Sequence, residues 1–143
     1  MLIEEEILIN APLEKAWKTF TDLTCWVDWN SVLKDVSTEH DSIEKGETFS
    51  WSLRPFIFPV HFETFIEEVV LHERVVWSGS KYGIFARHEF SFEKFEDSVR
   101  VLSREAFKGI TVENMKLIFP AWRIRELKKP LLSDLKEASE TTK

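Results

Sequence analysis

Hydrophobic side chains recur with two different periods along the chain, and the change of period predicts the order of its elements. In the first nine residues apolar and charged residues alternate, which predicts a β-strand with Ile3, Ile7 and Ile9 on one face. Residues 13–23 carry apolar side chains at helical spacing, and Pro12 suits the first turn of a helix. The chain therefore begins with a strand and a helix whose apolar face needs a protein cover.

From about Val32 to Phe107 the pattern has period two and is divided by turn-forming residues. Turn signals stand at residues 45–46, 54–55, 79–83 and 96–98. This spacing predicts five or six antiparallel strands after the first one. Apolar and polar side chains alternate along each strand, as is typical of a sheet with one buried and one solvated face.

After Gly109 the period returns to that of a helix. Two apolar stripes follow, formed by Val112, Met115, Phe119 and Trp122 and then by Leu131, Leu135 and Ala138. Pro120 and Pro130 each cost about 3 kcal/mol inside a helix, so we expect a kinked helix or two consecutive pieces, the last starting near Pro130. This helix is the available cover for the apolar face of the sheet. Because a sheet twists, a straight helix contacts it unevenly, and we expect a cavity between them.

Length and charge limit the classes of function. The 143 residues suit a single domain, residues 1–143, and the net charge of -6 with scattered basic residues disfavours nucleic acid as a partner. No apolar run approaches the length of about 18 residues that spans a membrane, and the acidic N-terminus is unlike a secretory signal. We expect a cytoplasmic protein without stable membrane insertion, a monomer or weak homodimer. The acidic run at residues 4–6 is expected to be a solvated face.

Several kinds of chemistry lack the residues they need. The single cysteine, Cys25, excludes an internal disulfide and a multi-thiolate metal site, and we expect it to be a small buried hydrophobe. The histidines show no metal-ligand spacing such as HExxH. Four glycines are too few for a phosphate-binding loop, and no GxSxG motif is present. We therefore expect no metal and no cofactor.

Short motifs follow one another in a characteristic order along the whole chain. Asp22 precedes a Trp-x-x-Trp-Asn element at residues 26–30, a Trp-x-Gly element lies at residues 77–79, and a Glu-x-Phe-x-Gly element at residues 105–109 precedes the last helix. In this order and spacing they resemble the START-like (SRPBCC) superfamily, nearest its polyketide cyclase/dehydratase-like branch. Ser31 departs from the pattern, because a proline commonly follows the asparagine there.

The resemblance implies an α+β helix-grip fold. In such a fold a curved antiparallel sheet of six to seven strands wraps around a long C-terminal helix, and two short helices follow the first strand. A deep apolar pocket lies between the sheet and the helix. The superfamily includes lipid and hormone carriers, cyclases and chaperone activators, so the fold alone does not select a function.

The candidate ligand contacts combine strand parity with this implied pocket. Trp26 and Trp29 are expected at the rim of the cavity and Asn30 as a cap, although such rings also serve to fix a short helix onto a sheet. The expected contacts are Trp26, Trp29, Phe49, Trp51, Phe62, Thr64, Ile66, Trp77, Phe90, Val101, Ser103, Phe107, Met115, Phe119 and Trp122.

Glu105 and His88 form the sharpest candidate catalytic pair. Both fall on the inward parity of their strands, where a carboxylate in an apolar cavity and a neighbouring imidazole are suited to acid–base chemistry. The alternative is structural: Glu105 pairs with Arg87 or Arg104, or accepts from amides near Gly109, while His88 is a satisfied core histidine.

Three functions stay open at the level of sequence. The preferred one is binding of a small hydrophobic or amphipathic ligand, such as a lipid, an aromatic or a polyketide-like compound, in the cavity. The second is a cyclase or dehydratase that uses Glu105 and His88 as acid and base. The third is a protein-interaction domain of the chaperone-activator or toxin-like type, in which side chains fill the interior.

Overall fold

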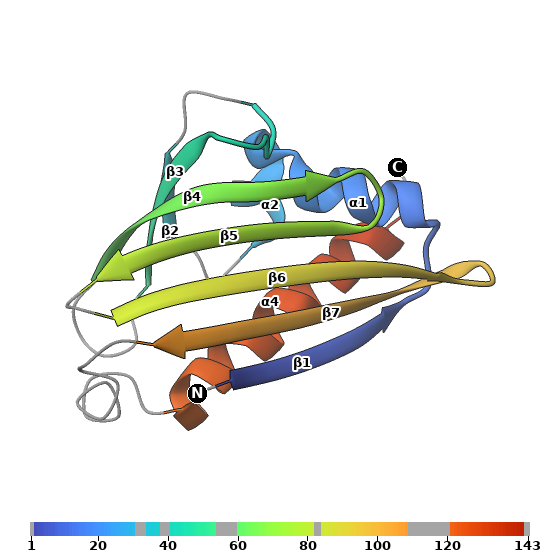
Figure 1. Cartoon of the computed structure of the whole chain (residues 1–143). Helices are drawn as coiled ribbons and strands as arrows, with labels where there is room; N and C mark the ends of the chain where they lie inside the picture. The colour runs from blue at the N-terminus through green and yellow to red at the C-terminus, as the bar shows by residue number, and fades with distance from the viewer. Residues whose placement is uncertain are drawn as a thin grey trace.

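A computed structural model describes residues 2–30, 34–37, 41–53, 60–81, 84–108 and 121–141. Within them one antiparallel sheet has the strand order β1-β7-β6-β5-β4-β3-β2 (Figure 1). Its strands are β1 (Leu2–Ile9), β2 (Lys34–Ser37), β3 (Thr48–Leu53), β4 (Val60–Val70), β5 (Arg74–Lys81), β6 (Ile84–Phe95) and β7 (Ser98–Lys108). The helical elements are α1 (Leu13–Thr21), the 3-10 turn η1 (Leu23–Cys25), α2 (Trp26–Trp29) and α4 (Ala121–Glu140). The predicted α+β architecture is confirmed.

Among the described tight turns, those at Gly46 and Glu96 lie where the sequence predicts them. Gly46, His72 and Glu96 have positive φ angles of 87°, 61° and 57°, the left-handed conformation that closes a short connection. Gly79 differs from expectation, because it lies inside β5 opposite Ala86 and not in a turn. A Cβ atom on Gly79 would stand 2.8 Å from the carbonyl oxygen of Glu63, so the neighbouring strand leaves no room for a side chain there.

The described helices all lie on one side of the sheet, behind it in the view of Figure 1. Leu131, Leu132 and Leu135 of α4 are buried in the same cluster as Ile9 and Val101 of the sheet. The long C-terminal helix therefore covers the inner, concave face, as predicted, and does not lie on the outer face.

The helix α4 runs continuously through Pro130. A second piece starting near Pro130 was one of the two expected arrangements, and the structure instead has one helix that begins immediately after Pro120 in the sequence. A proline in a helix interior lacks one backbone donor and costs about 3 kcal/mol. Burial of Leu131, directly after the proline, and of Leu135 one turn later offsets that cost.

The outer face of the sheet carries cross-strand ion pairs. Glu4 lies 3.1 Å from Arg104, and Glu6 lies 3.5 Å from Arg100, between β1 and β7. These side chains are about half exposed, so each pair contributes little stability. The expectation of a solvated face holds for Glu4 and Glu6.

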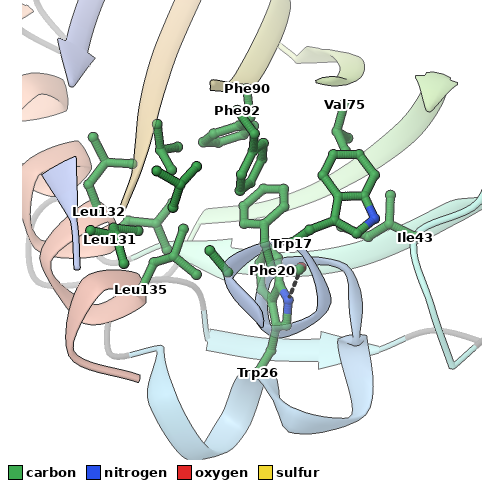
Figure 2. Close-up of a cluster of buried hydrophobic side chains, with 14 of the residues drawn as sticks. Trp17, Phe20, Trp26, Ile43, Val75, Phe90, Phe92, Leu131, Leu132 and Leu135 are labelled. Atoms are coloured by element: carbon green, nitrogen blue, oxygen red, sulfur yellow. Dashed lines mark hydrogen bonds between the residues drawn. The ribbon is translucent and has the colours of Figure 1, made fainter. Parts of the chain in front are cut away.

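Aromatic rings pack tightly where α1, α2 and the sheet meet. The ring of Phe20 contacts four others, Trp26, Trp77, Phe90 and Phe92, at centroid distances of 4.7 to 5.8 Å. Figure 2 shows Phe20 between Trp26 and the phenylalanines of β6, with the leucines of α4 alongside. We call these five residues the closed end of the concave face, because none of them exposes more than 5% of its surface.

The expectation that Cys25 is buried is wrong, because its side chain is exposed. The turn η1 points Leu23 and Trp26 inward, which directs Cys25 to the same outer side as Asp22. There the Asp22 carboxylate accepts hydrogen bonds from the Thr24 backbone and hydroxyl, at 3.1 and 2.5 Å, and from the Cys25 thiol. The Thr24 hydroxyl is the main cause of a lowered pKa at Asp22.

Candidate functional site

The inner face of β5, β6 and β7 brings together side chains that the sequence spreads from position 77 to position 105. Trp77 of β5 stands opposite His88 of β6, and His88 stands opposite Glu105 of β7. Because side chains alternate along a strand, all three point to the face that α4 covers. The fold therefore places the predicted pair Glu105 and His88 side by side.

Among the described residues, Ser103 and Glu105 lie near the two ring nitrogens of His88. Its Nε2 lies 2.6 Å from the hydroxyl oxygen of Ser103, and its Nδ1 lies 4.0 Å from a carboxylate oxygen of Glu105. The first distance is a short hydrogen bond and the second is that of a loose ion pair. We call His88, Ser103 and Glu105 the inner polar cluster.

The inner polar cluster is mostly shielded from solvent. His88 exposes 7% of its surface and Ser103 1%, while the Glu105 side chain exposes 18%. The imidazole stacks on Phe90 at 3.9 Å between centroids and meets the edge of Trp77 at 5.7 Å. These rings fix the plane of the imidazole, and Glu105 is the member of the cluster with the most exposed side chain.

A second polar pair lies on the neighbouring strands β3 and β4. The indole nitrogen of Trp51 donates a 2.7 Å hydrogen bond to the hydroxyl of Thr64. The Trp51 ring also stacks on Phe62, with centroids 4.5 Å apart and planes 17° apart. Trp51 and Phe62 are only partly buried, so they form a partly accessible aromatic surface on the inner face of β3 and β4.

The arginine partners proposed for Glu105 lie on the other side of the sheet. Arg87 pairs with Glu67 at 3.0 Å, and Arg104 pairs with Glu4 at 3.1 Å, both on the outer face. Ion pairing of Glu105 with either arginine is therefore not the structural role of this carboxylate. The other alternative, amides near Gly109, lies outside the described residues.

Glu5 is an inward carboxylate that the sequence interpretation missed. It pairs in register with Ser103 and is half-buried, whereas Glu4 and Glu6 beside it are exposed. Glu5 has the same strand parity as Ile3 and Ile7, and this parity was the sequence signal for its inward orientation. The acidic run was interpreted as one solvated face, and for Glu5 that expectation is wrong.

The two tryptophans of the Trp-x-x-Trp-Asn element have different environments. Trp26 is completely buried, and its indole nitrogen donates a 2.8 Å hydrogen bond to the carbonyl oxygen of Phe20. Trp29 is half-buried and meets Trp26 edge to face at 5.4 Å. Its indole nitrogen is buried and has no hydrogen-bond partner within the described part of the chain. Asn30 ends the helical turn, with its backbone N–H bonded to Trp26.

The other predicted ligand contacts divide into three groups. Phe49, Ile66, Phe90 and Val101 expose 1% or less, so a ligand would reach them only after side chains move. Phe107, by contrast, is half-buried. Met115 and Phe119 lie outside the described residues, as does the side chain of Trp122 in α4. The contacts of all these residues with a ligand, and the cavity itself, stay predictions.

Metal and membrane chemistry find no support in the part of the chain that the structure describes. Within it no three His, Cys, Asp or Glu side chains form a group suited to hold a metal ion. None of the described helices is long and apolar enough to cross a membrane.

Comparison with known proteins identifies the architecture but no sequence relative. No family model and no curated protein matches the chain. A hypothetical protein from Helicobacter pylori has a TM-score of 0.80 at 18% identity, covering 98% of this chain and 88% of its own. A protein from Thermus thermophilus has a TM-score of 0.78 at 15% identity, with 97% of each chain covered.

Norcoclaurine synthase from Thalictrum flavum has the same fold and was solved in complex with dopamine and hydroxybenzaldehyde. Its TM-score is 0.78 at 12% identity, covering 100% of this chain and 89% of its own. At these identities the likeness concerns the fold alone.

Proposed function

We propose that this chain, which has the helix-grip fold of the START-like superfamily, binds a small amphipathic molecule between its sheet and α4. The observation that carries the proposal is the inner polar cluster, set among aromatic rings on the covered face of the sheet. A face that served packing alone would be apolar, because each buried polar group has to recover the hydration it loses. Convergent polar groups in an aromatic setting are instead the usual composition of a small-molecule site.

The ligand class follows from the aromatic groups on the covered side of the sheet. Trp51 and Phe62 offer flat surfaces on which an aromatic ring or a lipid chain packs. The indole nitrogen of Trp29 is a donor without a partner in the described structure, and a ligand oxygen would satisfy it after a small shift of the ring. We therefore favour an apolar molecule with oxygen substituents, such as an aromatic, lipid or polyketide-like compound.

The chemistry of one fold neighbour supports this choice. The two molecules bound to norcoclaurine synthase, dopamine and hydroxybenzaldehyde, are both rings with polar substituents. The inner face of the present chain offers the same two kinds of contact through Trp51 and the inner polar cluster. We propose that the protein carries its ligand in the cytoplasm as a monomer or weak homodimer.

Two measurements test ligand binding directly. Native mass spectrometry of the mildly purified chain is expected to show a co-purifying small molecule. Calorimetric titration with hydroxybenzaldehyde and with a medium-chain fatty acid is expected to give saturable binding of at least one probe. If neither method detects a ligand, the proposal fails and a protein-interaction domain with a filled interior becomes the better explanation.

A matched pair of variants locates the site. Trp51→Leu removes a ring from the inner face, and Phe65→Leu removes one from the outer face of the adjacent strand, where Phe65 is 46% exposed. Loss of one stacking surface corresponds to about a tenfold weaker affinity. We expect that loss for Trp51→Leu and unchanged affinity for Phe65→Leu. Equal effects of the two changes would place the ligand elsewhere.

A second candidate function, acid–base catalysis of the cyclase or dehydratase type, is favoured by the contact between Glu105 and His88. The two side chains face each other across adjacent strands at 4.0 Å, a separation that a ligand-induced shift would close to a hydrogen bond. Glu105→Gln is then expected to abolish turnover of a bound substrate while binding persists. Glu93→Gln, an exposed carboxylate change on β6, is the control that retains activity.

A further inference from the structure

We propose that Lys136 and Glu140 of α4 form an edge clamp: they hold outward-facing backbone groups at the end of β1 and so keep a strand of a second copy from pairing there. The proposal goes beyond ligand binding, because it concerns association of the chain with itself. Its evidence lies at the opposite end of α4 from Pro120, where helix and strand meet.

The strand β1 forms one edge of the described sheet, in which β7 is its neighbour on the other side. The N–H and C=O groups along the outer side of an edge strand are a template for pairing with another chain. With eight residues, β1 is long enough for such pairing. Soluble proteins therefore protect an edge of this kind with charges or with a covering element.

The register shows which backbone groups of β1 face outward. A two-residue turn joins β6 to β7, with Phe95 opposite Ser98, and the closing pair of such a hairpin is hydrogen-bonded. Because backbone groups point alternately to the two sides of a strand, the next residue, Val99, bonds its partner Ile9 in β1. Odd-numbered residues of β1 thus bond β7, and even-numbered ones, such as Leu8, point their backbone groups outward.

Side chains from the end of α4 bond two backbone groups of this even parity. The Lys136 ammonium donates a 3.0 Å hydrogen bond to the carbonyl oxygen of Leu8. The N–H of Asn10, directly after the strand, donates a 2.9 Å hydrogen bond to the Glu140 carboxylate. Lys136 and Glu140 also bond each other, and the end of α4 lies near the corner where β1 leads into α1 (Figure 1). The pair supplies one donor and one acceptor, as a neighbouring strand would.

The order of the two charges is the reverse of the one that the helix alone favours. Glu140 is the last residue of α4, and a carboxylate is unfavourable at the negative end of a helix dipole. A glutamate followed four residues later by a lysine also stabilises an isolated helix more than the opposite order. The contacts with β1 explain the observed order, because Leu8 presents an acceptor and Asn10 a donor.

The middle of the same edge carries acidic side chains. Antiparallel pairing of β1 with the β1 of a second copy about its centre places Glu4 opposite Glu6. Like charges directly opposite each other destabilise a strand pair. Repulsion in the middle and the edge clamp at the end thus oppose the same contact. Salt screens the repulsion, whereas the hydrogen bonds of the edge clamp persist, and this difference allows the two to be tested separately.

Interchange of the two charges tests the contacts of the edge clamp. The double variant Lys136→Glu with Glu140→Lys keeps an ion pair on α4 but places an acceptor at Leu8 and a donor at Asn10. Hydrogen exchange measured by nuclear magnetic resonance is expected to be about tenfold faster at the Asn10 N–H of this variant than in the wild type. Glu137→Lys, an exposed charge reversal at the same end of the helix, is the control with unchanged exchange. Equal exchange at Asn10 in the double variant and the wild type would overturn the proposal.

Light scattering during size-exclusion chromatography tests the consequence for self-association. At about 1 M sodium chloride the Debye length is about 3 Å, so the repulsion between acidic side chains is screened. The double variant is expected to have a dimerisation constant about tenfold larger than that of the wild type or of Glu137→Lys. In the dimer the N–H groups of Glu4 and Glu6 should gain protection from exchange. A folded double variant that associates no more than the wild type, or associates without this protection, would overturn the proposal.

Circular dichroism establishes that each variant is folded. If the double variant does not fold, Lys136→Met replaces it in the light-scattering measurement, because it keeps the aliphatic stem of the lysine and loses the donor to Leu8. Both measurements use the ligand-free chain, so a failure of the edge clamp leaves the proposed ligand binding untouched. Absence of any ligand would in turn count against the proposed function alone.

Discussion

Two neighbouring regions of the concave face are built from different kinds of side chain. At the closed end, Phe20, Trp26 and Phe90 are packed ring against ring and expose 1% of their surface or less. Beside it, the inner polar cluster and, on β3, the partly buried Trp51 combine hydrogen bonds with aromatic surface. The comparison separates two kinds of interior: aromatic packing that supplies stability, and polar groups for which we propose ligand binding and proton exchange.

The position of the helices explains this difference. The helix α1 and the leucines of α4 contribute to the same buried cluster as Val75, Phe92 and Val99, next to the turns that join the strands. Their side chains complete the closed end. The inner polar cluster begins directly beside this packing, because His88 stacks on Phe90 with centroids 3.9 Å apart and meets the edge of Trp77. His88 and Ser103 bond each other at 2.6 Å, so these polar groups border the aromatic packing without leaving that hydrogen bond unmade.

The largest expected effect is at the hub of the closed end. Phe20→Ala removes a ring that contacts four others and leaves a void, which costs about 3 to 5 kcal/mol of unfolding free energy. Chemical denaturation followed by far-ultraviolet circular dichroism measures it. The control is Val27→Ala, at a side chain that is 84% exposed, with an expected change within about 0.5 kcal/mol. A loss below about 1 kcal/mol for Phe20→Ala would mean that the closed end does not carry the stability.

The next largest effect is the difference in stability between variants of Trp26 and Trp29, which lie three residues apart. Trp26→Phe leaves the carbonyl of Phe20 without its donor, so it costs about 1 to 3 kcal/mol beyond the lost packing. Trp29→Phe removes an indole nitrogen that bonds nothing in the described structure, so no hydrogen bond is lost in the ligand-free chain. We expect the first variant to be clearly less stable than the second by chemical denaturation.

Ligand binding should reverse this ranking. Trp29→Phe is expected to weaken binding of a probe that carries an oxygen acceptor, while Trp26→Phe, if folded, should bind normally. Calorimetric titration of both variants measures the contrast. Equal stability losses in the absence of ligand would show that Trp29 belongs to the closed end as much as Trp26 does.

Periodicity predicted the helices and strands well because it reflects which face of each element is buried. Alternation in β6 and β7 placed His88 and Glu105 on one face, and the register between those strands makes them neighbours. The helical stripe containing Leu131 and Leu135 placed α4 against the sheet. Parity carries such information whenever one face of an element is buried.

Three features were not predicted from the sequence, for physical reasons. Glu5 was grouped with the acids on either side of it, although alternation separates neighbours in a strand. Cys25 is exposed because a 3-10 turn rotates it away from the core, and a turn of three residues leaves no period to detect. The hydrogen bond between Ser103 and His88 is diagonal across two strands, and only the register and the rotamers together reveal it.

The smallest expected effect lies outside both regions of the concave face and concerns the loss of stability at acidic pH. The Ser78 hydroxyl, and then Arg87, lower the pKa of Glu67 on the outer face, and the Lys136 ammonium is the main cause of a lowered pKa at Glu140. A carboxyl group whose pKa is lower in the folded state stabilises the fold above its unfolded pKa, about 4.5 for glutamate, and loses that contribution as pH falls through the folded value. Unfolding free energy should therefore decrease progressively below about pH 5.

Glu67→Gln tests whether the loss of stability in acid comes from the outer face of the sheet. The variant cannot titrate at position 67, so its stability at neutral pH should be lower by up to about 1 kcal/mol, as for a surface pair, and its decline in acid correspondingly shallower. Glu93→Gln, an exposed acid for contrast, should follow the wild-type curve. Denaturation midpoints between pH 3 and pH 7 measure both slopes. If Glu67→Gln retains the full acid slope, the loss of stability in acid does not come from this pair on the outer face.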